Sequence, residues 1–452
     1  MTRSQALPHY VESNRFEHFL NYELVGKTAL RVQRWRDQWK LARRRPRPDS
    51  PLNPPLRSVV HMKEIMSRHY LEGRYAGGVR KVAWVTSGAP TEPLQALGYF
   101  LVYPENHAAL CGVRRQAQSI AEEAEHAGWS RDICSYARTD IGSMISGKTP
   151  AGRLPRPDLL VCCTNICQTV LHWYRVLADY FECPLVLVDT PFLYQEAQDH
   201  EIAYVKRQIE DMICVAEDIA GKPLDQERFQ EVMTNARRGA ELWIEVLNRS
   251  QHQPAPMTAF DGFIHMGPIV DMRGEAVTVA YYERVIAELD ERIERGIGAV
   301  KNERYRVLWD NLPIWFKIGE FSKWLAQRGV NVVASTYTYA WGELAPMIDP
   351  ARPLDSMARV YLHPILNRST GHKLDSMKKM VDEFALDGVI LHSDRSCKPY
   401  SLGQIDQRDR LVKKLGVPAL LLEADHNDPR DYSDEQGSNR LEAFVEMMEA
   451  RG

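Results

Sequence analysis

The chain contains the same order of elements twice, and this repetition limits its fold more than any other feature of the sequence. Asp158 opens an apolar run that is followed by Cys167, by a helical pattern and by a second apolar run with proline at its start. Asp387 opens an apolar run that is followed in the same order by Cys397, a helical pattern and another proline-led run. A sequence that repeats its elements in one order predicts two structurally related units.

Short apolar runs alternate with helical patterns in both copies, which is typical of parallel α/β units. Each copy contains four candidate strands. They are 81–87, 99–104, 158–164 and 184–189 in the first copy, and 305–312, 331–337, 387–393 and 418–424 in the second. We therefore expect an α/β fold with two flavodoxin-like parallel-sheet lobes.

The segments before and between the two copies show helical patterns. Residues 1–42 look amphipathic, and the basic, proline-rich stretch 43–55 that follows is interpreted as a linker. The expected division is a helical N-terminal extension with this linker (1–80), a first α/β lobe (81–200), a helical connecting region (201–303) and a second α/β lobe (304–452). A chain of 452 residues usually forms more than one domain, which agrees with this division.

The composition indicates neither a nucleic-acid partner nor a membrane partner. A formal net charge of -3, with 26% charged and 44% hydrophobic residues, is ordinary for a globular protein. The N-terminus lacks the pattern of a signal peptide, and no apolar run reaches the roughly eighteen residues that span a bilayer. We therefore expect a cytoplasmic protein, whose eight cysteines stay reduced and are available for metal binding or catalysis.

Two of the cysteines occupy equivalent positions in the two predicted lobes. Cys167 and Cys397 each follow a buried-type strand and precede a helix, which places both thiols at the carboxyl edges of the sheets, where ligands bind in open parallel sheets. The chain contains neither the Cys-x2-Cys pairs of structural zinc sites nor the closely spaced cysteines of ferredoxins. Any metal site would therefore be assembled by the fold. Cys134 is a candidate third ligand, because possible hydrogen-bond donors follow it at 135–138.

The remaining cysteines favour a packing role. Cys162 and Cys163 lie inside a predicted strand, Cys183 precedes another strand, and Cys214 lies within a helical pattern. A free cysteine in such a position usually behaves as a small buried hydrophobe. Cys111 stays a spare candidate, since it could line the same cleft as the predicted ligands.

The segment Tyr-Pro-Glu-Asn-His directly follows the second predicted strand. It contains Glu105 and His107. One interpretation is a turn with a helix cap, and the other is that one of these side chains transfers a proton, because burial can tune both types toward neutral pH. The pattern by itself leaves both interpretations open.

Four motifs together resemble those of the 2-hydroxyacyl-CoA dehydratase and benzoyl-CoA reductase subunit family, over about residues 80–430. They are YPENH at 103–107, CSYAR at 134–138, CCTNICQTV around Cys167 and SDRSCKPYS around Cys397. The resemblance implies that Cys134, Cys167 and Cys397 ligate one 4Fe–4S cluster. Three protein ligands would leave one iron with an open position, as catalytic metal sites require.

The resemblance also implies partners. A homologous cluster-bearing subunit would pair with this chain, and ATP-hydrolysing iron–sulfur activator subunits, with ferredoxin as the electron donor, would supply single electrons. The chain itself lacks the Walker-type phosphate loop G-x4-G-K-[ST], so we expect ATP chemistry in another chain.

Two features favour a reductase within this family. Gln168 follows Cys167 where dehydratase subunits typically have aspartate, and the long segment before Lys81 resembles the larger cluster-bearing subunit of ATP-dependent (class I) benzoyl-CoA reductases. We expect ATP-dependent, ferredoxin-driven dearomatisation of the acyl-CoA substrate benzoyl-CoA to a cyclohexadiene-carboxyl-CoA in anaerobic aromatic degradation, with Glu105 or His107 as the proton donor.

Three alternatives remain open. A 2-hydroxyacyl-CoA dehydratase subunit would use the same cluster but would form a ketyl radical and recycle its electron. A non-catalytic scaffold or electron-transfer subunit would leave acyl-CoA binding to its partner. A two-lobed small-molecule binding protein would contain no iron.

Overall fold

The structure is a computed structural model that describes Tyr10 and residues 13–43 and 48–451. Residues 1–9 and 11–12 of the N-terminus, part of the predicted linker (44–47) and residue 452 lie outside the described residues. The predicted lack of a signal peptide concerns the first of these segments. Among the helices of the described part, none is both long enough and apolar enough to cross a membrane. The cytoplasmic location stays a prediction.

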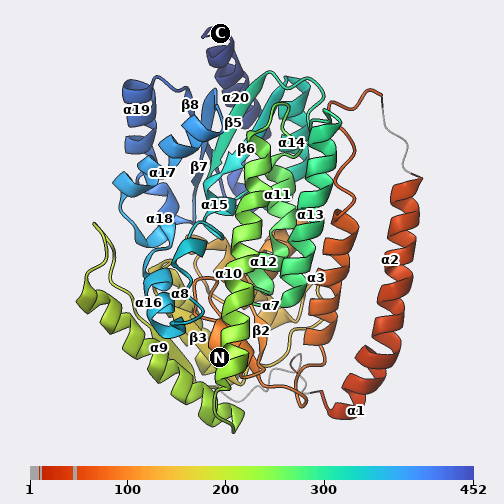
Figure 1. Ribbon diagram of the computed structural model, residues 1–452, viewed down its shortest axis with the longest axis vertical. Coiled ribbons are helices and arrows are strands. Elements are labelled where there is room, and N and C mark those ends of the chain that lie inside the picture. The colour runs from red at the N-terminus through yellow and green to blue at the C-terminus, as the bar shows by residue number, and fades with distance from the viewer. Residues whose placement is uncertain (1–9, 11–12, 44–47, 452) are drawn as a thin grey trace.

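Two parallel four-stranded sheets confirm the α/β fold with two lobes (Figure 1). The first sheet contains β1 (Val82–Val85), β2 (Phe100–Val102), β3 (Leu159–Cys163) and β4 (Leu185–Val188), and the second contains β5 (Tyr305–Asp310), β6 (Val330–Ser335), β7 (Gly388–Asp394) and β8 (Ala419–Ala424). The orders are β2-β1-β3-β4 and β6-β5-β7-β8. Both sheets thus have the order second, first, third, fourth, which is that of flavodoxin-like folds. All eight predicted strands are confirmed.

The repeated aspartates start equivalent strands and hold the neighbouring strand in register. The carboxylate of Asp158 accepts a hydrogen bond from the backbone N–H of Val82, at 2.9 Å. In the second lobe, the carboxylate of Asp387 accepts one from the backbone N–H of Arg306, at 2.8 Å. Each bond ties the start of the central strand to the segment that opens the third strand. The aspartate that is repeated in the sequence therefore has the same structural role in both lobes.

Helices cover both sheets and connect the lobes. In the first lobe they are α4 (Glu92–Ala96), α5 (Pro104–Val113), α6 (Ala117–His126), α7 (Ser135–Ser146) and α8 (Gln168–Phe181). In the second they are η3 (Trp315–Lys317), α14 (Ile318–Gln327), α15 (Thr336–Tyr339), η4 (Ala345–Met347), α16 (Pro353–Leu362), η5 (Ile365–Asn367), α17 (Thr370–Glu383), α18 (Lys398–Ser401), α19 (Gln404–Leu415), η6 (Pro429–Asp431) and α20 (Asp434–Glu449).

The connecting region and the N-terminal segment are helical, as expected. The connecting helices are α9 (Asp199–Ala220), α10 (Gln226–Asn248), η2 (Arg249–Gln251), α11 (Ala259–His265), α12 (Gly267–Asp271) and α13 (Ala276–Glu294), and the N-terminal ones are α1 (Arg15–Glu17), the π-helical η1 (His18–Gly26), α2 (Lys27–Ala42) and α3 (Val59–Gly73). In Figure 1 the two sheets lie one above the other, α10 and α13 run along the long axis, and α2 lies at the outer edge beside α3. The helix α9 contacts β4 of the first lobe and α16 of the second.

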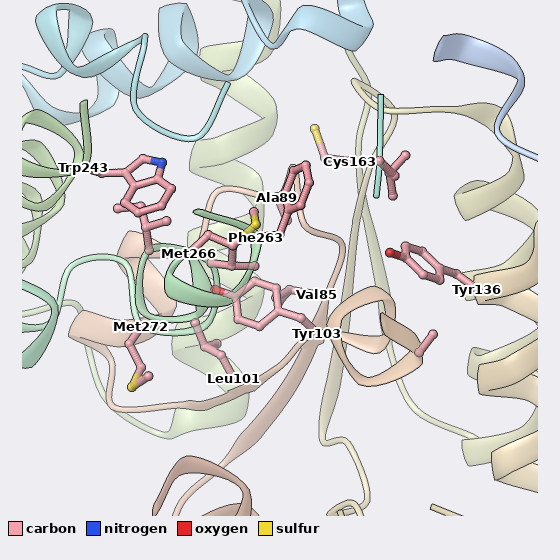
Figure 2. Packing of buried hydrophobic residues seen from close by; sticks show 14 of the residues in the cluster. Val85, Ala89, Leu101, Tyr103, Tyr136, Cys163, Trp243, Phe263, Met266 and Met272 are labelled. Carbon is pink, nitrogen blue, oxygen red and sulfur yellow. The ribbon is translucent and has the colours of Figure 1, made fainter. Parts of the chain in front are cut away.

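The lobes and the connecting region share one hydrophobic core. Strand residues such as Val85 and Leu101 pack with Trp243, Phe263 and Met266 from the connecting helices (Figure 2). The same cluster of buried residues extends into both sheets. This shared core fixes the position of one sheet relative to the other. The exact domain boundaries stay a prediction.

Candidate functional site

The carboxyl ends of strands from both sheets meet at one cavity of about 220 Å³. Ser87 follows β1, Leu312 follows β5 and Tyr337 follows β6, and all three line the cavity. In parallel sheets this edge gathers the loops between strands and helices, so side chains from distant parts of the chain come together there. A cavity therefore lies at the edge of the sheets where the sequence predicts the interlobe site.

All three cysteines predicted as ligands line this cavity. Cys134, Cys167 and Cys397 immediately precede α7, α8 and α18, respectively. Helix N-termini present backbone N–H groups and a partial positive charge, which favour a thiolate. Two cysteines come from the first lobe and one from the second. The structure thus places all three cysteines, from both lobes, along one cavity. The group of described side chains whose ligand atoms lie within 4.8 Å of one another is a different one, Asp394, Asp425 and His426.

The chemistry of this donor set fits a soft metal centre. None of the three cysteines is in a disulfide. Burial, with Cys134 as the second cause, raises the pKa of Cys167 to about 11. Burial, followed by Asp394 and the other two cysteines, raises the pKa of Cys397 well above its usual value. These shifts favour the protonated thiols of Cys167 and Cys397, and a bound cation would favour their thiolates. Their role as ligands stays a prediction.

The other five cysteines divide into buried and exposed positions. Cys162 and Cys163 are fully buried in β3, and Cys183 is half-buried against the core, in agreement with a packing role. The prediction that Cys214 is buried is wrong, because its side chain lies on the exposed face of α9. Cys111 is fully buried in α5 and lies outside the lining of the cavity, so it is not a residue of the cleft.

The structure separates the two candidate proton donors. Glu105 lines the cavity and accepts a hydrogen bond from the backbone N–H of Ser87, at 3.1 Å. Its Oε2 atom is buried and has no hydrogen-bond partner among the described residues. Burial raises the pKa of Glu105 to about 7, despite bonds from Ser87 that lower it. A carboxyl of this pKa can both give and take a proton near neutral pH.

His107 lies outside the lining of the cavity, although it follows Glu105 by only two residues. Its Nε2 atom is 2.6 Å from the hydroxyl of Thr149 and 3.8 Å from the sulfur of Cys111. Burial lowers the pKa of His107 to about 4, so the imidazole is neutral at physiological pH. These contacts indicate that His107 has a packing role around α5.

His426, which was not predicted from the sequence, follows β8 and lines the cavity. Its Nδ1 atom is 2.7 Å from a carboxylate oxygen of Asp394 and its Nε2 atom is 2.9 Å from the hydroxyl of Ser135. Burial alone would lower the pKa of His426, but Asp394 and Asp425 raise it well above the usual value, and Cys134 is a further hydrogen-bond partner. A positive imidazolium therefore lies beside a predicted ligand. Its position directly after a strand was the signal that could have identified it.

The polar residues after Cys134 have partners of their own. Arg138 is fully buried and donates to Asp428 at 2.9 Å and to Glu125 at 2.6 Å. The hydroxyl of Tyr136 accepts a hydrogen bond from the indole N–H of Trp315. Arg138 lies outside the lining of the cavity and its Nη1 atom pairs with carboxylates, so its role as a donor to the metal site stays a prediction. Its pairing with Asp428 connects the two lobes beside the cavity.

Comparison with known proteins gives one family and several relatives. The sequence model of the family described as "2-hydroxyglutaryl-CoA dehydratase, D-component" matches residues 86–448. The chain is 35% identical to the (R)-2-hydroxyisocaproyl-CoA dehydratase alpha subunit of Clostridioides difficile, over 82% of this chain and 91% of that protein. It is 30% identical to the (R)-phenyllactyl-CoA dehydratase alpha subunit of Clostridium sporogenes, over 86% and 97%. It is also 30% identical to a benzoyl-CoA reductase subunit of Thauera aromatica, over 87% and 95%.

Proposed function

The chain belongs to the 2-hydroxyglutaryl-CoA dehydratase D-component family, and from this membership we propose that it is the cluster-bearing catalytic subunit of an enzyme that performs one-electron chemistry on an acyl-CoA. One observation carries the proposal. Cys134, Cys167 and Cys397 line a single cavity together with Glu105, whose pKa of about 7 suits proton transfer.

In this proposal the three cysteines hold a 4Fe–4S cluster. When bound, such a cluster supplies low-potential electrons one at a time, and three protein ligands leave one iron accessible to substrate. The helix N-termini at α7, α8 and α18 offset part of the negative charge of the thiolates.

The protein's own residues prepare the site for proton transfer. Glu105 holds or releases a proton at its unpartnered Oε2 atom, which is buried at the cavity. Apolar side chains such as Val170, Trp173 and Leu312 form much of the remaining lining and exclude water. Exclusion of water prevents loss of electrons to solvent protons. We favour Glu105 over His107 as the proton donor on this geometry.

The first candidate reaction is ATP-dependent, ferredoxin-driven reduction of benzoyl-CoA to a cyclohexadiene-carboxyl-CoA. It agrees with the similarity to a benzoyl-CoA reductase subunit and with the Gln168 that follows Cys167. The relatives are named as subunits, which supports a homologous cluster-bearing partner. ATP-hydrolysing iron–sulfur activator subunits would deliver the electrons.

The second candidate reaction is dehydration of a 2-hydroxyacyl-CoA through a ketyl radical. The observation that favours it is the 35% identity to the (R)-2-hydroxyisocaproyl-CoA dehydratase alpha subunit. The same cavity would serve this reaction. The substrate hydroxyl would leave as hydroxide and Glu105 would take the proton that the substrate loses, so that the two together are released as water.

Electron stoichiometry distinguishes the two reactions. The complex is reconstituted anaerobically with its partner and activator, and electrons consumed per product are counted with benzoyl-CoA and with 2-hydroxyacyl-CoAs. Reduction of the ring consumes two electrons for each product, whereas dehydration needs only a priming electron. A ratio near zero with efficient turnover of 2-hydroxyacyl-CoA would replace the first candidate by the second.

Iron analysis tests the ligand set itself. We expect about four iron atoms in each anaerobically prepared chain, and loss of most of this iron in the Cys134→Ala, Cys167→Ala and Cys397→Ala variants. Cys214→Ala is the matched control, because Cys214 is exposed on α9, and it should keep all its iron. A wild-type chain without iron, or a triad variant with full iron, would contradict the proposed site.

A further inference from the structure

We propose that the cavity accepts an uncharged, bulky and apolar acyl group, branched aliphatic or aromatic, and rejects an acyl group that carries a second carboxylate. This inference rests on the proposed function, because it concerns the acyl part of a CoA thioester in the same cavity. It assigns a substrate class that is common to both candidate reactions.

The wall of the cavity is built from large apolar side chains on several elements. Helix α8 contributes two of them and α16 another two, and the loops around η4 and η5 complete the wall. These residues are Val170, Trp173, Ile348, Met357, Val360 and Ile365. A wall of this kind gains free energy when it covers apolar surface of a ligand, and it offers no hydrogen bond to a polar one.

The two basic side chains among the described lining residues are both neutralised inside the protein. The first is Arg273. Its Nε atom is 3.2 Å from a carboxylate oxygen of Glu92, and its Nη2 atom donates to the hydroxyls of Thr91 and Tyr361, each at 3.1 Å. Only 12% of the Arg273 side chain and 5% of the Glu92 side chain are exposed. The hydroxyl of Tyr361 in turn donates a hydrogen bond to Glu92 at 2.7 Å, so the three side chains form one hydrogen-bonded cluster.

The second basic side chain is His426, which is paired with Asp394 at 2.7 Å and is fully buried. A substrate carboxylate in the cavity would therefore lose its water without gaining a cation that is free to pair with it. Burial of an unpaired carboxylate is strongly unfavourable. The charged residues of the cavity thus select against a dicarboxylic acyl group, while the apolar wall selects for a hydrophobic one.

Size should matter as well as charge. A short acyl chain would leave part of the wall around Trp173 and Met357 without contact, whereas a branched or aromatic chain would cover it. A single methylene in an apolar pocket typically changes affinity or specificity about 10–200-fold. We therefore expect affinity to rise from a three-carbon acyl group to a branched six-carbon or phenyl-bearing one.

The test measures binding of unreactive thioesters, so it does not depend on which reaction the enzyme performs. The anaerobic complex of this chain with its partner is titrated with 4-methylpentanoyl-CoA, 3-phenylpropanoyl-CoA, propanoyl-CoA and glutaryl-CoA, and free CoA is the reference. We expect the first two to bind at least about tenfold more tightly than propanoyl-CoA. We expect glutaryl-CoA to bind at least about a hundredfold more weakly than 4-methylpentanoyl-CoA.

The outcomes separate this inference from the proposed function. If glutaryl-CoA binds as tightly as 4-methylpentanoyl-CoA, the acyl specificity is wrong while the acyl-CoA function stands. If no thioester binds more tightly than free CoA, the proposed acyl-CoA function itself is wrong. Both results come from the wild-type complex, so neither depends on the folding of a variant.

One substitution tests whether the apolar wall of the cavity determines the specificity for the acyl group. Val360 is half-buried and lines the cavity, so Val360→Arg should introduce an unpaired cation there. We expect the affinity ratio of glutaryl-CoA to 4-methylpentanoyl-CoA to rise at least about tenfold, whereas Val360→Leu, the matched control, should leave it low. Unfolding temperature and iron content identify a misfolded variant. A folded Val360→Arg chain with the wild-type ratio would contradict the placement of the acyl group against α16.

Discussion

Of the two carboxyl side chains that line the cavity, Glu92 pairs with an arginine, whereas Glu105 forms no ion pair with any described residue. Asp394 is paired with His426 and Glu92 with Arg273, while Glu105 accepts from a backbone N–H and leaves its second oxygen without a partner. An unpaired buried carboxyl favours its neutral form, and this explains why its pKa rises to about 7. The buried and unpaired state of the Glu105 carboxyl therefore allows it to exchange a proton near neutral pH.

The first prediction concerns the pH dependence of turnover. As a proton donor, Glu105 acts in its protonated form, so the rate of ring reduction should fall as the pH rises above about 7. Glu105→Gln should lower kcat by about 10²–10⁴-fold and remove this descending limb. The measurement is kcat against pH for the reconstituted complex, with constant electron supply.

His107→Gln serves as the control, because Gln can still bond to Thr149 and because His107 lies outside the cavity. It should keep the wild-type pH profile. If this variant loses the descending limb while Glu105→Gln retains it, the assignment of the two residues is reversed.

The second prediction concerns the buried ion pair that connects the lobes. Arg138 is fully buried in α7, and it donates to Asp428, which follows β8. Arg138→Met removes a cation from two carboxylates, so the free energy of unfolding should fall by about 3 kcal/mol. In Arg138→Met/Asp428→Asn the loss should be smaller than the sum of the single losses, because the unpaired charge is removed as well. Urea unfolding of the four proteins measures this coupling, and strict additivity would contradict it.

The same pair should make stability depend on acid pH. Burial alone would raise the pKa of Asp428, but hydrogen bonds from Arg430 and Arg138 lower it to about 2. Because this value lies below that of the unfolded chain, the stabilisation is complete above about pH 4 and is lost as the pH falls toward 2. In Arg138→Met the stability should change less over this interval.

At the scale of elements, helix starts position the sulfur atoms. Sequence patterns placed Cys167 and Cys397 directly after strands and before helices, and both positions agree with the structure. Cys134 follows a loop after α6 instead, so no strand signal preceded it, and its place depended on the resemblance. What brings Cys134 to the cavity is the close packing of α7 against α6.

The third prediction tests this packing. A Cβ at Gly142 of α7 would come within 1.9 Å of the backbone oxygen of Ile120 in α6, which the helices can accommodate only by moving apart. Gly142→Ala should therefore lower stability by about 1–3 kcal/mol and reduce iron content, because Cys134 begins the displaced helix. Unfolding midpoints and iron analysis measure both effects.

Gly319→Ala in α14 is the matched control. A Cβ there would meet no atom within 4 Å, so the substitution should leave iron unchanged and raise stability slightly, since alanine favours helices by about 1 kcal/mol. Equal stability losses in both variants would show that close contact with α6 is not the cause.

At the scale of the whole molecule, one core joins two lobes that have the same strand order. The fully buried Trp84 in β1 and Trp309 in β5 occupy equivalent strands of the two sheets. The connecting helices pack against both sheets in the same hydrophobic cluster. A second buried cluster, which includes Val333, Val389 and Leu411, lies outside this shared one. Loss of the shared cluster in one lobe should nevertheless expose apolar surface of the other.

The fourth prediction is therefore cooperative unfolding of the described core. Trp84→Phe leaves Trp309 as a reporter of the second lobe, and Trp309→Phe leaves Trp84 as a reporter of the first. Other tryptophans also fluoresce, so the signal of each reporter is the difference between the unfolding curves of the wild type and of the variant that lacks it. The two difference curves should have the same denaturation midpoint, and circular dichroism should give that midpoint as well. Two separate midpoints would show that the lobes unfold independently.

The sequence by itself determined the eight strands, the repeated order of the lobes and the edge of the sheets where Cys167 and Cys397 lie. These features follow from local patterns, because apolar runs, helical spacing and strand-to-helix position are readable within one segment.

Only the tertiary structure decided which polar side chains face the cavity. Glu105 and His107 are two residues apart on α5 and project on different sides of that helix, so packing, and not residue type, separates them. Cys214 was expected to be buried and is exposed, since only the docking of α9 determines its outer face. The pairing of Arg138 with Asp428 joins residues 290 positions apart. Contacts of this range depend on how the two lobes close against each other, and no local pattern contains that information.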